Sequence, residues 1–189
     1  MLYINDDIES IDPDRVMDGI PRQRRERLMQ LRNARDRRLG LAAYMLLCGA
    51  LEVEYGITGM PDFGYGDGGK PFIADRPDIC FNMSHCRVAA ACAVGGSPMG
   101  VDIETIRPYN ATLARRVLSG VELAAVEASL RPDIEFIRLW TMKESYLKMT
   151  GEGIRRDLKT VLPASAIFST TVNTVRGYVC TVCRGSDGL

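Results

Sequence analysis

The chain has 189 residues, of which 46% are hydrophobic and 25% are charged. This balance is typical of a globular protein with a sizeable core, built as one large domain or as two small halves. Lysine plus arginine equals aspartate plus glutamate at 24 each, which excludes a generally basic surface for nucleic acid or an anionic membrane. An arginine-rich run between residues 22 and 38 nevertheless predicts a local anion site.

Location and redox state are also constrained by the composition. No segment approaches the ~20 consecutive apolar residues that a membrane helix needs, and the first nine residues carry three acids instead of a basic signal start. The closest cysteine pair, Cys180 and Cys183, has neither a second pair nor a neighbouring histidine, which makes it weak evidence for zinc. We therefore expect a cytoplasmic protein that has reduced thiols and binds neither membranes nor nucleic acids.

Hydrophobic periodicity predicts the elements of the first half. A strand is expected at residues 1–4, a brief helical or irregular connection at 12–19, and one long helix from Pro21 to about Glu54. The glycine-rich segment 64–71 is expected to be a loop, because so many glycines lose too much entropy in a helix or strand. Residues 81–94 indicate two strands around a polar turn at 84–87.

The second half predicts a mixture of helices and strands. Gly95 to Pro98 favour a turn into the next strand, and Pro132 fits the first turn of a helix. The expected elements are a strand at 99–104, helices at 110–118, 121–130 and 132–149, and two or three strands near Val161, at 167–172 and at 178–182. The whole pattern indicates an α+β fold.

Two acids occupy alternate positions of the strand at 99–104. Asp102 and Glu104 would leave one face of this strand, while Val101 and Ile103 leave the other. Neighbouring carboxylates repel one another unless a cation lies between them, and all-oxygen ligands suit Mg²⁺. A half-exposed strand with a solvated acidic face explains the pair equally simply, so by itself it is weak evidence for a metal site.

The segment from Trp140 to Lys148 is the most distinctive of the chain. On the predicted helix, Glu144 and Lys148 lie along one edge of an apolar stripe. A glutamate followed four residues later by a lysine is also an ordinary surface ion pair, worth ~0.2–0.5 kcal/mol. That explanation does not account for the position of the only tryptophan directly before the Lys143-Glu144 pair.

Three further parts of the chain have both a structural and a chemical interpretation. The only histidine, His85, follows Ser84 in a predicted turn and could donate to a phosphate, although a lone histidine is more often a satisfied polar group. Lys70 ends the glycine-rich segment, where lysines are usually solvated. Ser119 and Glu122 fit a capping box at the start of a helix, which explains both without catalysis.

Five motifs, taken together and in this order, resemble those of the 4′-phosphopantetheinyl transferases. They are Gly69-Lys-Pro, Phe81-Asn-Met-Ser-His85, Gly100-Val-Asp-Ile-Glu104, Ser119 to Glu122, and Trp140 to Lys148. The likeness is to the larger monomeric type that includes the surfactin synthetase activator, and it spans roughly residues 20 to 160. Each motif is modest alone, but the order and the spacing make the resemblance specific.

The resemblance implies a fold and an active site. The fold would be two similar α+β halves in one chain, a pseudo-dimer divided into residues 1–98 and 99–189, with the active site in the cleft between them. Asp102, Glu104 and Glu144 would hold Mg²⁺, for which Mn²⁺ substitutes, against the pyrophosphate of coenzyme A. Binding of coenzyme A would further involve Arg24, Arg27 and Arg38 at the 3′-phosphate, Lys70 at the adenylate, and Ser84, His85 and Lys148 at the other phosphates.

The reaction implied by the resemblance is transfer of 4′-phosphopantetheine to a serine of an apo acyl or peptidyl carrier protein, with release of 3′,5′-ADP. Glu144 or Glu122 would remove the serine proton, and the sequence does not choose between them. Leu113, Val117 and Leu118 are spaced to line one helix face, which would be either a carrier surface or core. The rival interpretations are a metal-dependent phosphohydrolase that uses water, and a module that binds coenzyme A without chemistry.

Overall fold

The computed structural model describes residues 1–189 except 32, 67–68, 154–156 and 186–189. Its first elements are β1 (Leu2–Asn5), η1 (Ile8–Ser10), α1 (Pro13–Met17), α2 (Arg22–Met29), α3 (Ala34–Tyr55), β2 (Phe63–Tyr65), β3 (Pro71–Ile73), β4 (Cys80–His85) and β5 (Ala90–Gly95). They are followed by β6 (Met99–Thr105), α4 (Ala111–Val117), α5 (Gly120–Glu127), α6 (Pro132–Thr150), η2 (Leu158–Thr160), β7 (Ile167–Asn173) and β8 (Tyr178–Arg184). The predicted mixed α and β composition is confirmed.

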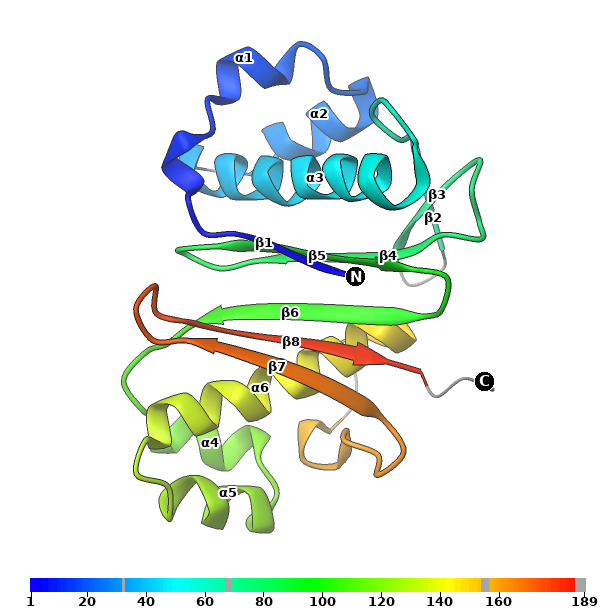
Figure 1. The fold of residues 1–189 in the computed structure, drawn as a ribbon. Helices are drawn as coiled ribbons and strands as arrows, with labels where there is room; N and C mark the ends of the chain where they lie inside the picture. Colours follow the sequence, from blue (N-terminus) through cyan, green and yellow to red (C-terminus); the bar gives the residue numbers. More distant parts are fainter. Residues whose placement is uncertain (32, 67–68, 154–156, 186–189) are drawn as a thin grey trace.

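Two antiparallel three-stranded sheets form the centre of the molecule. Their strand orders are β1-β5-β4 and β6-β8-β7, and β2 pairs with β3 in a separate hairpin. Figure 1 shows α1, α2 and α3 on the outer side of the first sheet, and α4, α5 and α6 on the outer side of the second. The described chain is thus layered as helices, sheet, sheet and helices. None of its described helices has the length and apolar character to cross a bilayer.

The core between the two sheets follows from the alternation of side chains along each strand. Ala91 and Ala93 of β5 belong to the same buried cluster as Val101 and Ile103 of β6. Because neighbouring residues of a strand point to opposite faces, Asp102 is directed away from this cluster, toward α6. The predicted division of the strand into an apolar and an acidic face is therefore confirmed.

Side chains, instead of a backbone ladder, join β4 to β6. The amide of Val101 donates to Oδ1 of Asn82 at 2.9 Å, and the amide of Ile103 donates to Oγ of Ser84 at 3.4 Å. Asn82 and Ser84 are two residues apart and thus share one face of β4. Their polar atoms satisfy backbone donors of β6 and place Ser84 directly beside Asp102.

The prediction of one helix over residues 21–54 is wrong, because two helices occupy this range. The second begins after Asn33, whose backbone is extended and whose side chain accepts a hydrogen bond from the amide of Asp36 at 2.7 Å. An asparagine at this position satisfies amides that the first turn leaves unpaired. No proline or glycine lies between residues 22 and 39, so the sequence has no strong helix-breaking signal here and the asparagine cap was overlooked.

The prediction of a loop over residues 64–71 is wrong at both ends, because Gly64 and Tyr65 lie in β2 and Pro71 lies in β3. Gly64 is paired with Phe72 across the hairpin. A Cβ atom at Gly64 would lie only 2.2 Å from Cζ of Phe72, so glycine here lets the Phe72 ring lie across the hairpin. The centre of the segment, residues 67–68, lies outside the described residues.

Two smaller expectations also differ from the structure. Strand β4 continues to His85, so the turn lies after it, closed by a hydrogen bond from the amide of Cys86 to the carbonyl of Ala89 at 2.8 Å. Val161 follows the short 3-10 helix η2 and is not in a strand. It is nevertheless almost fully buried. The apolar residues near Val161 that suggested a strand therefore reflect packing in the core and not strand pairing.

Candidate functional site

The best-defined polar cluster of the described chain joins β4, β6 and α6. Lys148 donates from Nζ to Oδ1 of Asp102 at 2.6 Å and to Oγ of Ser84 at 2.9 Å, and Ser84 donates to the same aspartate oxygen at 2.9 Å. The Asp102 side chain is only 5% exposed, whereas that of Lys148 is 30% exposed. A buried carboxylate is therefore neutralised by an ammonium that still reaches solvent.

This geometry corrects the simple surface interpretation of the helix motif. A surface pair would join Glu144 to Lys148 along α6, but the hydrogen-bond partners of Lys148 lie on β6 and β4. Glu144 is left with a buried Oε1 that has no hydrogen-bond partner among the described residues. The two residues thus face the same polar region without satisfying one another.

Glu104 and Glu144 share an electrostatic environment with Asp102. Burial raises the pKa of both carboxyl groups, and the negative charge of Asp102 raises each of them further. Lys148 opposes this shift at both groups, and Arg107, 3.3 Å from Glu104, opposes it at that residue. Additional positive charge near these three interacting carboxyl groups would therefore be favourable.

The donor set fits a hard divalent cation. Oδ2 of Asp102 and Oε1 of Glu144 are both buried without a partner in the described part of the chain, and carboxylate oxygens are the ligands that Mg²⁺ and Mn²⁺ accept. Within the same residues, no group of three or more acidic, histidine or cysteine side chains is already arranged around a metal position. These oxygen atoms are thus of the type that such an ion prefers. In this structure, Asp102 is hydrogen-bonded to Lys148 instead.

A cavity of 230 Å³ adjoins this cluster and is lined from both sides of the sheet junction. Its walls include Asn82 and Met83 of β4, together with Glu144 and Lys148 of α6. Lys70 also lines the cavity, and its ammonium donates to the carbonyls of Met149 at 2.8 Å and Met99 at 3.3 Å. Burial lowers the pKa of Lys70. Since an ammonium has three donors, one N–H of Lys70 is left for a ligand.

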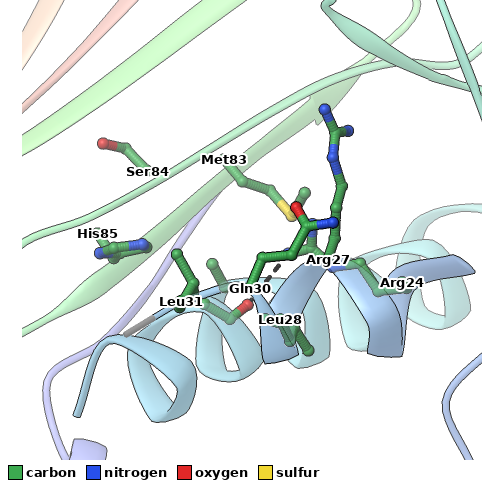
Figure 2. A pocket seen from close by; sticks show the side chains of 10 residues that line it. Arg24, Arg27, Leu28, Gln30, Leu31, Met83, Ser84 and His85 are labelled. Carbon is green, nitrogen blue, oxygen red and sulfur yellow. Dashed lines mark hydrogen bonds between the residues drawn. The ribbon is translucent and has the colours of Figure 1, made fainter. Parts of the chain in front are cut away.

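A second cavity, of 390 Å³, lies between α2 and β4. Figure 2 shows Met83 and His85 of β4 on one side of it and Arg27, Gln30 and Leu31 on the other. The guanidinium of Arg27 is exposed and lies 4.1 Å from the centre of the Tyr65 ring. The His85 side chain reaches the surface, but the atoms packed around its ring remove part of its hydration. This desolvation lowers the pKa of His85, and the positive charge of Lys148 lowers it further. A cationic arginine and an imidazole therefore border the same opening.

The other two arginines predicted to bind anions have partners within the protein. Arg24 lines the second cavity, but its guanidinium donates to the carbonyl of Gly40 at 3.2 Å, lies over Tyr44 and Phe63, and has a pKa lowered by burial. Arg38 is paired with Glu9 instead. Of the three arginines, Arg27 is thus the one whose charge is most available to a ligand.

The predicted capping box is confirmed, and it has an extra member. Oε2 of Glu122 accepts from the amide of Ser119 at 2.7 Å, while Oε1 accepts from Nζ of Lys143 at 2.7 Å. Lys143 is 1% exposed. Lys143 and Asn82 lie in the quoted motifs without a predicted role, because a lysine in a charged helix and an asparagine in a strand carry no local sign of burial.

The three apolar residues at α4 were predicted to be either a carrier surface or core, and they differ in exposure. Leu113 is 38% exposed, but Val117 and Leu118 are buried at 5% and 2%. The latter two pack in the cluster formed by α4, α5 and α6. The hypothesis of a three-residue carrier surface is therefore wrong for Val117 and Leu118, which belong to the core.

Comparison with known proteins identifies the class of this chain. A family model described as the 4′-phosphopantetheinyl transferase superfamily matches residues 98–183. A 4′-phosphopantetheinyl transferase of Bacillus subtilis is 33% identical over 158 residues, which cover 81% of this chain and 70% of that relative. The 4′-phosphopantetheinyl transferase Sfp of Bacillus subtilis strain 168 is 30% identical with the same two coverages, 81% and 70%. HetI of Nostoc is 37% identical over 59% of this chain and 49% of its own.

The chain belongs to the 4′-phosphopantetheinyl transferase superfamily, as the motif resemblance predicted. Within it, the extended matches are to the type represented by Sfp, and the protein is an enzyme of this class.

Proposed function

We propose that this enzyme transfers the 4′-phosphopantetheine group of coenzyme A to a serine of an acyl or peptidyl carrier protein and releases 3′,5′-ADP. One observation carries the proposal: buried Asp102, held by Lys148 and Ser84, adjoins a cavity that Glu144 and Lys148 line. Such a site combines metal ligands with a cation able to meet a phosphate. The names of the relatives support the choice of substrate.

Coenzyme A would extend across both cavities. Arg27, which lines the second cavity together with Arg24, would attract the 3′-phosphate there, and Lys70 would hold the adenylate part. Arg38 does not line this cavity and would join them only by leaving Glu9. His85, Ser84 and Lys148 border the space between these positions, and His85 and Lys148 would donate to the remaining phosphates. Ser84 would donate to a phosphate only by turning its hydroxyl away from Asp102. The active site would then lie between two similar halves, residues 1–98 and 99–189, as in a pseudo-dimer.

Asp102, Glu104 and Glu144 are the residues that would hold Mg²⁺ or Mn²⁺. The unpartnered buried oxygens of Asp102 and Glu144 and the raised pKa values of Glu104 and Glu144 support this assignment. When bound, the ion neutralises charge on the pyrophosphate and aligns it for displacement. Lys148 would turn from Asp102 toward the phosphate.

In the chemical step, the carrier serine oxygen forms a bond to the β-phosphorus of coenzyme A. The bond from that phosphorus to the oxygen bridging to the α-phosphate breaks, and 3′,5′-ADP leaves with its electron pair. The serine proton passes to a carboxylate, either Glu144 or Glu122. Lys148 stabilises negative charge on the phosphate oxygens, and positioning of this kind accounts for most catalysis in phosphoryl transfer.

Intact-protein mass spectrometry tests the function directly. Purified enzyme with coenzyme A, Mg²⁺ and an apo carrier protein should yield a carrier heavier by one phosphopantetheine, and an otherwise identical carrier with its acceptor serine changed to alanine should stay unmodified. Cleavage of coenzyme A without carrier modification would establish the hydrolase instead. Binding without any consumption would establish a binding module. Cytoplasmic location and a monomeric state stay predictions from the sequence.

A further inference from the structure

Lys143 is a charged side chain buried as deeply as the aliphatic core. It is 1% exposed, and its Nζ donates to Oε1 of Glu122 and to the carbonyl of Leu158, both at 2.7 Å. Burial of an ammonium is costly unless hydrogen bonds and an opposite charge compensate for it. Both compensations are present, so the position of this side chain is narrowly fixed.

Both oxygens of the partner carboxylate, Glu122, also accept hydrogen bonds from within the protein. Oε1 of Glu122 accepts from Lys143 and Oε2 accepts from the amide of Ser119. The Glu122 side chain is 16% exposed. Through these bonds the pair connects the start of α5, the middle of α6 and the short helix η2 that contains Leu158.

We infer that Lys143 is a positioning residue for the proposed transfer reaction, and that Glu122 acts through it and is not the general base. Lys143 and Glu144 are consecutive on α6 and so point about 100° apart around the helix axis. Anchoring Lys143 against α5 and η2 therefore sets the rotation with which Glu144, and Lys148 one turn later, face the cavity. The inference rests on the proposed function, since it assigns the base within that same site.

The two roles of Glu122 predict different results for one nearly isosteric change. Glu122→Gln keeps one oxygen that accepts from Lys143, whereas its NH2 group replaces the acceptor of the Ser119 amide, so the melting temperature should fall. Because Lys143 keeps an acceptor, a positioning role should survive with kcat per folded molecule within a few-fold of wild type. A general base cannot be replaced by an amide, and its loss lowers the rate on the order of a hundredfold or more. Under the inference, the acid limb of the kcat pH profile also stays where it is in wild type.

Lys143→Met tests the positioning role, because methionine fills a similar volume without the charge. We expect the melting temperature to fall on the order of 10 °C, because a buried carboxylate loses its partner. At a temperature well below melting and with saturating coenzyme A, kcat should fall about tenfold or more, as expected from a small misplacement of reacting groups. The Kd for coenzyme A, measured by calorimetry, should change less than about twofold.

The matched control is Glu135→Gln, which removes an ion pair with Arg138 on the same helix, far along α6 from the cavity. This variant should keep the wild-type kcat. Full kcat per folded molecule in Lys143→Met would overturn the positioning role, and a hundredfold loss of kcat per folded molecule in Glu122→Gln, together with loss of the acid limb of the pH profile, would overturn the assignment of Glu122. Should Lys143→Met not fold, Lys143→Gln, which keeps a donor for Glu122, takes its place with the same criterion. A wild-type enzyme that transfers nothing would refute the proposed function itself.

Discussion

At the scale of single residues, Lys148 connects structure to chemistry most directly. Lys148→Ala removes the cation beside a carboxylate that is 5% exposed, which should cost about 1–3 kcal/mol of stability. If Lys148 also stabilises the phosphate, kcat should fall on the order of a hundredfold or more. Lys148→Arg should recover only part of the rate, because a wide planar fork replaces a compact ammonium.

Steady-state kinetics and urea unfolding separate these two effects of Lys148. The exposed Lys159 provides the control, since Lys159→Ala removes the same charge away from the cluster and should change neither quantity appreciably. A Lys148→Ala enzyme with normal kcat and reduced stability would limit Lys148 to neutralising Asp102.

The raised pKa values of Glu104 and Glu144 predict a pH-dependent response to Mg²⁺. A carboxyl group whose pKa is raised by folding supports stability below its ordinary pKa, and this contribution is lost as the pH rises through the raised value. A cation bound between the deprotonated carboxylates would offset this loss of stability, because it neutralises their mutual repulsion. The gain in melting temperature on adding Mg²⁺ should therefore be larger at about pH 8 than at about pH 5.

Thermal unfolding with and without Mg²⁺ at both pH values measures this response. Glu144→Gln should lose most of the gain, because an amide is a weaker ligand than a carboxylate. Equal gains at both pH values, or an unchanged gain in Glu144→Gln, would place the ion elsewhere.

At the scale of elements, the contact of β6 with α6 depends on Gly100. A Cβ atom there would lie 2.0 Å from the carbonyl oxygen of Ser145 and 2.5 Å from the amide nitrogen of Met149. Both are backbone atoms, so only a shift of the whole helix could relieve the overlap. Gly100→Ala should therefore cost about 3 kcal/mol or more of unfolding free energy, and should lower activity because α6 carries Glu144 and Lys148.

Gly96→Ala is the matched control for this prediction. It lies in the turn before β6, and an added Cβ would meet no atom within 4 Å. Its stability should stay within about 0.5 kcal/mol of wild type in urea unfolding. Equal stability of the two variants would show that α6 packs less closely on β6 than the distances at Gly100 indicate.

At the scale of the whole molecule, the site exists because two sheets meet. Ser84 belongs to the first sheet and Asp102 to the second, and Lys148, 46 residues after Asp102, comes from the helix covering the second sheet. Asn82 and Ser84 use side-chain oxygens to satisfy amides of β6. The polar junction thus stabilises the association of the sheets and holds the candidate site residues at one place.

The sequence by itself determined the class of the enzyme, the α+β composition and the candidates Asp102, Glu104, Glu144 and Lys148. These features depend on local order: alternation along a strand, periodicity along a helix, and short motifs read in sequence. The capping box at Ser119 was equally predictable, because both of its partners lie within one turn.

Only the tertiary structure decided which partner each of these residues has. Lys148 pairs with Asp102 instead of the nearby Glu144, Glu122 binds Lys143, and Val117 is in the core. Periodicity gives the face from which a side chain leaves, but the partner on that face comes from elements 21 or 46 residues away. Burial then selects among the possible pairs, since a charge removed from water needs an opposite charge within hydrogen-bonding distance.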